Sequence, residues 1–267
     1  MKKFLVIWLL IIPFTIYAQQ IPSSAYAISI GGIGQPIISS FSAYYNQAAL
    51  ARLQSRYDAN IFYRGLLNVP TLSDKAFAFA YKPWDNSAIA TSYHFTGFDI
   101  YSYQRVSIAY GMRAANDLYI GSQINLHIIH QPAYYGNIYT TTAELSLLYT
   151  PSDNLIIASH IFNFWYKLVD KNIPAIAEIA LAYSFSEKVF FAVELEKQID
   201  QPLVWRWGTD YKPIKNFSLR FGGYLFNNLY TITFGTGIKY KWLDLNLGFE
   251  SQPLLGLTSS INLRFSL

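Results

Sequence analysis

The side chains of this chain that could carry chemistry are charged residues that alternate with apolar neighbours along extended stretches. Successive side chains of a strand point to opposite faces, so the charged members of each stretch share one face. Acids and bases fall on neighbouring stretches, and pairs such as Glu194 with Arg206 would either stiffen a wall or line a polar path for a solute. The charged residues that we expect to line an enclosed lumen are Arg56, Arg64, Glu144, Glu178, Glu194, Glu196, Arg206, Asp210, Arg220, Asp244, Glu250 and Arg264.

Four histidines raise the question of a metal or catalytic site. His127 and His130 lie three residues apart, so in a strand they point to opposite faces and cannot share a metal ion. His94 and His160 have no metal-binding side chain at a useful spacing in the sequence. Ser159 and His160 alternate in facing, which removes the nearest pairing of a nucleophile with a base. We therefore expect no metal, no cofactor and no catalytic residues, and no enzyme activity.

The last stretch shows which elements must position the charged residues. Ile261, Leu263, Phe265 and Leu267 share one face there, and Asn262, Arg264 and Ser266 share the other. Many such stretches recur upstream with few helices to cover them, so a wall with lipid outside and a wet interior is favoured. An open sheet edge in lipid would leave backbone groups unsatisfied at several kcal/mol each, so the wall must close. We expect residues 257–267 to pair with residues 56–64 as the seam of an all-β, closed antiparallel transmembrane β-barrel.

Composition agrees with this fold class. The chain is 52% hydrophobic and only 13% charged, yet no stretch after residue 18 is apolar for the 20 or so residues that a membrane-spanning helix needs. The 22 Tyr, 19 Phe and 6 Trp could form aromatic girdles at two membrane interfaces. A large aromatic β-sandwich is the alternative.

Other features exclude several classes of protein. Residues 1–18 have two lysines, an apolar run and a closing Ala18, which is typical of a cleaved secretory signal peptide. The chain has no cysteine, which excludes disulfides and thiolate chemistry. Its net charge of +4 is small and evenly scattered, so we expect no binding of nucleic acid. The glycines at 31, 32 and 34 are followed by Pro36 rather than by a helix, so they form no phosphate loop.

The chain after the signal peptide divides into two parts. Residues 19–53 are glycine-rich and then rich in small and apolar residues, and we expect them to form a plug-like segment inside the barrel or at its mouth. Residues 54–267 form the barrel, with about fourteen strands; twelve or sixteen would also be tolerable. The predicted strands are residues 54–65, 74–82, 86–97, 100–113, 117–130, 138–150, 154–166, 175–186, 188–198, 202–212, 216–226, 228–240, 241–251 and 255–267.

A repeated turn motif supports this division. Residues 81–86, 149–154 and 211–216 share the pattern Tyr-x-Pro-x-x-Asn, in which Pro fixes φ in the turn and Asn closes it. The motif falls after even-numbered strands, where a periplasmic N-terminus would place the periplasmic turns. The connections after odd-numbered strands are longer, as in outer-membrane barrels.

Residues 25–50 resemble the N-terminal signature of the FadL-like outer-membrane proteins, and of their PorV and PorQ branch associated with type IX secretion. The resemblance rests on Gly31, Gly32 and Gly34 in a small-residue stretch, and on Asn46, Ala48 and Leu50 in Tyr-Asn-Gln-Ala-Ala-Leu. Gln47 stands where Pro is usual, and residues 36–42 lack the usual acidic residues. The resemblance implies a fourteen-stranded barrel with an N-terminal plug.

Two functions follow from this interpretation. The first is a component or partner of an outer-membrane secretion or assembly machine, and the alternative is a transporter or channel for small hydrophobic solutes. Either places the protein in the outer membrane of a Gram-negative bacterium. Its expected partners are outer-membrane lipid, other outer-membrane or secretion proteins, and a hydrophobic solute.

Overall fold

The computed structural model describes residues 24–66, 71–132, 134, 136–166, 173–252 and 256–267. The predicted signal peptide, residues 1–18, lies outside them. In the described part, fourteen antiparallel strands close into one barrel in sequence order, and β1 pairs with β14 at the seam. The strands are β1 (Tyr57–Gly65), β2 (Ser73–Trp84), β3 (Ser87–Gly97), β4 (Ser102–Ala115), β5 (Leu118–His130), β6 (Ile138–Ser152), β7 (Leu155–Phe162), β8 (Ile176–Ser186), β9 (Val189–Gln198), β10 (Val204–Ile214), β11 (Phe217–Phe226), β12 (Leu229–Tyr240), β13 (Leu243–Gln252) and β14 (Gly256–Ser266).

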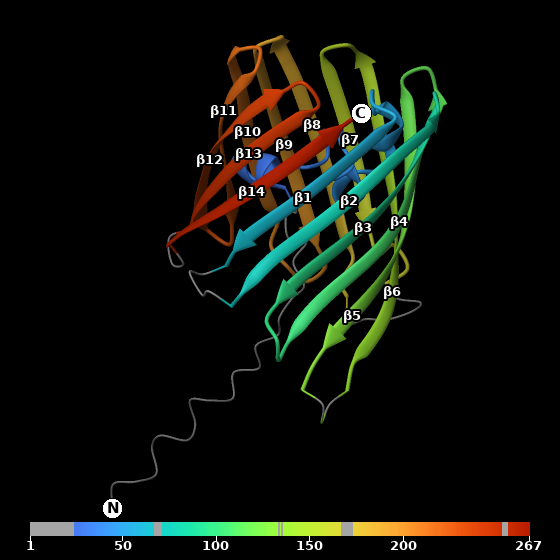
Figure 1. Ribbon diagram of the computed structural model, residues 1–267, viewed down its shortest axis with the longest axis vertical. Coiled ribbons are helices and arrows are strands. Elements are labelled where there is room, and N and C mark those ends of the chain that lie inside the picture. Colours follow the sequence, from blue (N-terminus) through green and yellow to red (C-terminus); the bar gives the residue numbers. More distant parts are fainter. Residues whose placement is uncertain (1–23, 67–70, 133, 135, 167–172, 253–255) are drawn as a thin grey trace, which may run out of the picture.

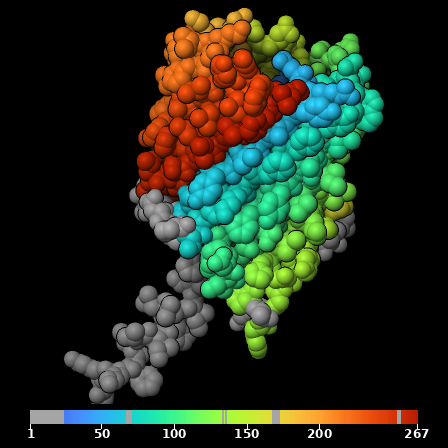
Figure 2. Space-filling model, in the orientation of Figure 1, coloured from blue at the N-terminus to red at the C-terminus, as the bar shows by residue number. Residues whose placement is uncertain are grey.

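The predicted fold class, strand number and seam are confirmed. Ile261 of β14 lies opposite Tyr63 of β1, and Arg264 lies opposite Asn60. Figure 2 shows the same seam from outside, where β14 and β1 lie side by side at the surface with no break between them. None of the helices in the described ranges has the length and apolar character that would let it cross a membrane.

The barrel has the inside-out polarity that the alternation predicts. In β5 the outward Ile124 is 62% exposed, whereas the inward Asn125 and His127 are fully buried. The same inversion recurs in β4, where Ile108 is 67% exposed and Ser107 is buried. Apolar side chains on the outside and buried polar ones inside suit a wall surrounded by hydrocarbon.

The two ends of the barrel differ in their connections. At the end that we call the turn end, which is uppermost in Figure 1, six connections of two residues each join β2 to β3, β4 to β5, β6 to β7, β8 to β9, β10 to β11 and β12 to β13. The opposite end, the loop end, carries mostly longer connections, such as residues 163–175 between β7 and β8.

In the repeated motif the last two residues form the predicted turn at the turn end, whereas the proline before them lies in a bulge of the strand. The strand register shifts between Tyr81 and Trp84, between Tyr149 and Ser152, and between Tyr211 and Ile214. A proline lies inside each interval, and because it has no N–H it cannot take part in the ladder. The strands therefore resume after the proline and end two residues later than predicted.

The strand β7 is shorter than predicted. It ends at Phe162 rather than at residue 166, because Asn163 adopts a left-handed φ of 51° that turns the chain away. The Asn163 side chain then donates a hydrogen bond to the carbonyl oxygen of Ile173, which ties the two ends of this connection together.

Residues 24–53, which we call the N-terminal segment, lie inside the ring of strands (Figure 1). The segment contains helix α1 (Ala25–Ser29), helix α2 (Ser42–Tyr45) and the 3₁₀ helix η2 (Gln47–Arg52). Helix α1 contacts β11 to β14, and η2 contacts β3 to β6 on the other side of the lumen. Nearly every residue of the segment is buried.

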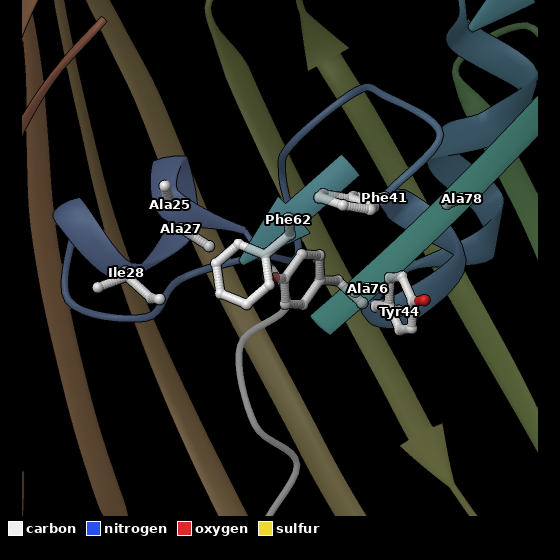
Figure 3. Close-up of a cluster of buried hydrophobic side chains, with 9 residues drawn as sticks. Ala25, Ala27, Ile28, Phe41, Tyr44, Phe62, Ala76 and Ala78 are labelled. Atoms are coloured by element: carbon white, nitrogen blue, oxygen red, sulfur yellow. The ribbon is translucent and has the colours of Figure 1, made fainter. Parts of the chain in front are cut away.

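The main apolar cluster of the lumen joins the segment to the wall. Figure 3 shows Phe41 and Tyr44 of the segment packed beside Phe62 of β1 and beside two alanines of β2. The rings of Phe41 and Tyr44 meet edge to face, with their centroids 5.4 Å apart. Large side chains on the segment thus face small ones on β2, so the segment fits close to the wall.

Candidate functional site

A cavity of about 920 Å³ lies inside the barrel near the turn end, and we call it the vestibule. It lies between the N-terminal segment and the inner faces of β9 to β14. Its apolar lining includes Ile37 and Ile38 of the segment, together with Ile156 and Phe190 of the wall. A neighbouring cavity of about 290 Å³ shares Tyr26, Phe190 and Asp210 with it.

The charged groups deep in the vestibule, Asp210 and Arg220, are paired with each other. The Tyr26 hydroxyl donates a hydrogen bond of 2.9 Å to Asp210 Oδ2, and Arg220 Nε lies 3.5 Å from the same oxygen. The Arg220 guanidinium lies over the Tyr26 ring, 4.1 Å from its centroid, in a cation–π contact. Burial, reinforced by the Asp210 carboxylate, raises the pKa of the Tyr26 phenol, so the phenol stays protonated and keeps donating.

A second group of charges lines the vestibule near the seam. Arg264 Nη2 lies 2.7 Å from Asp58 Oδ2, and its Nε donates to the same oxygen at 2.8 Å. Arg264 Nη1 lies 3.9 Å from Asp244. Asp58 also accepts a hydrogen bond from the backbone N–H of Ser40, which ties the segment to β1.

Toward the loop end, a group of buried ionisable side chains lines the inner face of the wall, and we call it the charged belt. Its members are Arg64, Asp74, His94, Arg105, Glu144, His160, Glu178, Glu194, Glu196, Arg206 and Glu250. Arg64 bridges two carboxylates, with Asp74 at 3.2 Å and Glu250 at 3.3 Å. His94 Nε2 contacts Asp74 from the other side.

The centre of the charged belt is Glu144, which is fully buried. Its oxygens accept hydrogen bonds from Asn125 Nδ2 at 2.7 Å and from Gln47 Nε2 of the segment at 2.7 Å. His160 joins Glu144 to Glu178, with nitrogen to oxygen distances of 2.8 and 2.7 Å. This pairing means that the belt braces the wall rather than leaving charges open to a solute. Removing one member of a buried pair costs about 3–5 kcal/mol.

The next part of the belt has Arg206 at its centre. Arg206 Nε lies 3.5 Å from Glu194, its Nη2 donates to Glu196, and its guanidinium lies 5.3 Å from the centroid of the Tyr224 ring. Glu178 also accepts a hydrogen bond of 2.6 Å from Gln35 Nε2 of the segment. The segment therefore bonds to the belt through Gln35 and Gln47, and through the carbonyl oxygen of Gly31, which accepts from Arg206 Nη1 at 3.5 Å.

The N-terminal segment rests on two patches of inward-facing glycines, which we call the glycine cradles. The first consists of Gly111 and Gly121, which lie opposite each other on β4 and β5 beneath η2. The second lies beneath α1. It consists of Gly208, Gly222, Gly235 and Gly248. A Cβ added at any of these six glycines would fall within about 2.6 Å of an atom of the N-terminal segment.

The segment residues of the family-like motif have structural roles. Gly31 and Gly32 have φ values of 79° and 82°, which favour glycine, and a Cβ at Gly34 would fall 2.1 Å from the Tyr45 ring. The Asn46 side chain caps η2 by accepting from the Ala48 N–H, and it donates to the carbonyl oxygen of Leu147. Ala48 and Leu50 are fully buried against the wall.

The twelve predicted charges do not all share one environment. Arg56 does not line the lumen. It precedes β1, is exposed, and bonds to the Tyr81 hydroxyl at 3.4 Å, because the alternation does not continue past the strand end. Asp244 and Arg264 are half-buried in the vestibule. The remaining nine are buried inside the barrel, and they are Arg64, Glu144, Glu178, Glu194, Glu196, Arg206, Asp210, Arg220 and Glu250.

Sequence reasoning missed several inward groups. Asp58 and Asp74 alternate with apolar neighbours and could have been found in this way. Arg105 and His160 are also buried inside the barrel, on β4 and β7, and they were not among the predicted inward charges. Sequence spacing also did not show the partners of His160, because Glu144 and Glu178 reach it from the strands on either side. Within the ranges that the structure describes, no group of three or more His, Asp or Glu side chains is arranged to hold a metal ion.

Comparisons with known proteins bear on the fold. No family model matches the chain, and no curated protein matches it. Among solved structures, the toluene transporter TodX of Pseudomonas putida is similar with a TM-score of 0.72 and 11% identity, over 93% of this chain and 99% of TodX. The chain has the fold of the FadL-like barrels.

Two further structures give the same result. The CymD monoaromatic hydrocarbon channel is similar with a TM-score of 0.71 and 10% identity, over 93% of this chain and 98% of CymD. A Pseudomonas aeruginosa FadL homologue is similar with a TM-score of 0.68 and 8% identity, over 91% of this chain and 98% of the homologue. At these identities the FadL-like likeness concerns the fold alone.

Proposed function

We propose that this protein is an outer-membrane channel for small hydrophobic solutes in a Gram-negative bacterium, with its turn end facing the periplasm. The observation that carries the proposal is the vestibule of about 920 Å³, which lies inside the barrel, is open at the turn end and is lined on the segment side by Ile37 and Ile38. Cavities of about 300–1,000 Å³ with mainly apolar linings are the usual size for small-molecule sites.

The fold supports the same proposal. TodX and CymD share it, and they are described as a toluene transporter and a monoaromatic hydrocarbon channel. The charged belt adds a reason to favour an uncharged solute, since its carboxylates and guanidinium groups are paired with one another. A solute that crosses this barrel would gain little from them.

In this proposal, the N-terminal segment controls passage. Its middle part, residues 35–41, lies between the vestibule and the charged belt, and Gln35 and Ser40 bond to the wall on either side. The two ends of the segment rest in the glycine cradles. A solute could therefore pass if the middle part shifts while the ends stay in place.

A reversible lock tests the proposal. Ser40 Oγ accepts a hydrogen bond of 2.7 Å from Asn60 Nδ2 of β1, so Ser40→Cys with Asn60→Cys replaces two side chains in contact by thiols, in a chain with no other cysteine. We expect proteoliposomes with the oxidised pair to take up toluene far more slowly than the same liposomes after reduction. The single variant Ser40→Cys is the control, and oxidant should not change its uptake.

Two results would count against the proposal. Toluene uptake no faster than in empty liposomes, with or without the lock, would exclude a channel for this class of solute. Equal uptake in the oxidised and reduced states would mean that passage does not run past residue 40. The role in a secretion machine stays a prediction. The similar structures are described as solute channels and transporters, and they do not test it.

A further inference from the structure

Five lysines gather around the mouth of the vestibule. They come from three successive turn-end connections: Lys188 follows β8, Lys212 and Lys215 flank the end of β10, and Lys239 and Lys241 flank the end of β12. All five line the vestibule and are exposed. We call this group the lysine rim.

The lysine rim is unpaired, in contrast to the interior. Among the ion pairs of the described residues, none joins a rim ammonium group to a carboxylate within 4.0 Å, whereas Arg220 and Arg264 are paired with aspartates deeper in the vestibule. The exposed carboxylate closest in sequence is Glu187. Unpaired positive charge is therefore available at the mouth and not below it.

The charge is also one-sided. The other three turn-end connections, on the β2 to β7 side, carry exposed Asp85, Asp117 and Asp153. Among the described residues, one half of the turn end thus carries five exposed lysines against the single exposed acid Glu187, whereas the other half carries both signs, because the exposed Arg56 and Arg113 accompany its three aspartates. Such a distribution steers a partner of opposite charge pattern and orients it on arrival.

The position of the lysines argues against lipid headgroups as their partner. The outward positions at the same level of β10 and β12 are aromatic, with Tyr211 and Tyr240 exposed on the outer wall. Lys212 and Lys239 have the opposite parity and face the mouth of the lumen. A lipid headgroup in the surrounding leaflet would contact these outward side chains, whereas the lysine rim faces the mouth of the lumen.

We propose that the lysine rim is a docking surface for an acidic polypeptide segment on the periplasmic side, which inserts an apolar side chain against Ile37, Ile38 and Phe190. A small anion would meet only one or two rim lysines at a time, because Arg220 and Arg264 deeper in the cavity are already paired. A polypeptide instead spans the three connections and meets the five lysines at once. This proposal adds a partner to the proposed channel and does not require transport.

Binding of a defined peptide tests the proposal. The full protein in zwitterionic detergent is titrated into a fluorescent peptide that is rich in Asp and Glu and carries one central Leu, and anisotropy is followed. We expect saturable binding that weakens as salt is added. Replacing the five rim lysines with Gln should weaken binding at least about tenfold, because rim charges govern association.

Controls separate this proposal from the alternatives. The double variant Lys75→Gln with Lys197→Gln removes two exposed lysines at the loop end and should bind the peptide like the wild type. Unchanged affinity in the five-lysine variant would overturn the proposal. So would displacement of the peptide by an equal concentration of a free dicarboxylate, or by micelles containing phosphatidylglycerol, since these would show a small-anion or lipid site. Because detergent exposes both ends, failure here leaves the toluene result untouched.

Discussion

Replacing Gly121 with alanine should loosen the N-terminal segment while leaving the barrel closed. A Cβ at Gly121 would lie 2.3 Å from the backbone nitrogen of Ala48 and 2.4 Å from the carbonyl carbon of Gln47. Both atoms belong to the backbone of η2, so no side chain can rotate away to make room. The helix has to retreat from the wall.

The size of the effect follows from these distances. Restoring ordinary contact at about 3.4 Å moves η2 by about 1 Å, and the hydrogen bond from the Ala48 N–H to Ser146 Oγ would open from 2.9 Å to beyond bonding range. The lost bond costs about 1 kcal/mol and the overpacking about 1–3 kcal/mol. The detached state should then be populated roughly thirty-fold more, or higher still.

Trypsin can report this detachment. Arg52 ends η2 and contacts the Tyr119 ring, and Lys82 donates to the carbonyl oxygens of the residues on either side of it. We expect cleavage after Arg52 to be at least about tenfold faster in Gly121→Ala than in the wild type, with the folded barrel still showing heat-dependent migration in gels.

Gly65→Ala is the matched control, because a Cβ at Gly65 meets nothing within 4 Å. It should be cleaved at the wild-type rate. If Gly121→Ala were cleaved no faster than Gly65→Ala, then the segment would not depend on close approach to the wall, and the role assigned to the glycine cradles would be wrong.

Three further predictions concern charged and phenolic groups. Arg64→Met strands two buried carboxylates and should lower stability by about 3–5 kcal/mol in denaturant titrations, whereas adding Asp74→Asn and Glu250→Gln should recover most of the loss. Arg56→Ala should change the free energy of unfolding by less than about 0.5 kcal/mol in the same titration, since Arg56 is exposed. Because burial raises the pKa of Tyr26, its contribution to stability is complete below the usual tyrosine pKa of about 10 and is lost as pH rises through the higher pKa of the folded state. Tyr26 therefore stays protonated in the folded protein at about pH 11, where free tyrosines ionise. The variant Tyr26→Phe should accordingly show the same tyrosinate absorbance as the wild type up to about pH 11.

The barrel could be predicted because its determinants are local. Alternation along β5 and β14 shows two faces within a single strand, and the seam follows from the need to satisfy both edges in lipid. Strand ends were less predictable. The ladder resumes after Pro83, for example, and the sequence does not show that a bulge rather than a turn absorbs the proline.

The contacts inside the lumen depend on register and on the segment, which alternation does not encode. His160 lies between Glu144 and Glu178 only because β6, β7 and β8 pair in one particular register. The vestibule and the lysine rim were likewise not foreseen, because they need the segment on one side and three turn-end connections on the other. Arg56 shows the reverse error, in which a local pattern was extended past the element that gave it meaning.

The glycine cradles make the wall glycines and the N-terminal segment depend on each other during evolution. Any side chain at Gly111, Gly121 or the four glycines under α1 would collide with the segment or with the wall around it, so a descendant that keeps the segment inside can hardly change them. A descendant that loses the segment is released from that constraint at all six sites together. Among homologous barrels, glycine at these wall positions should therefore be inherited with the segment and drift away when it is lost.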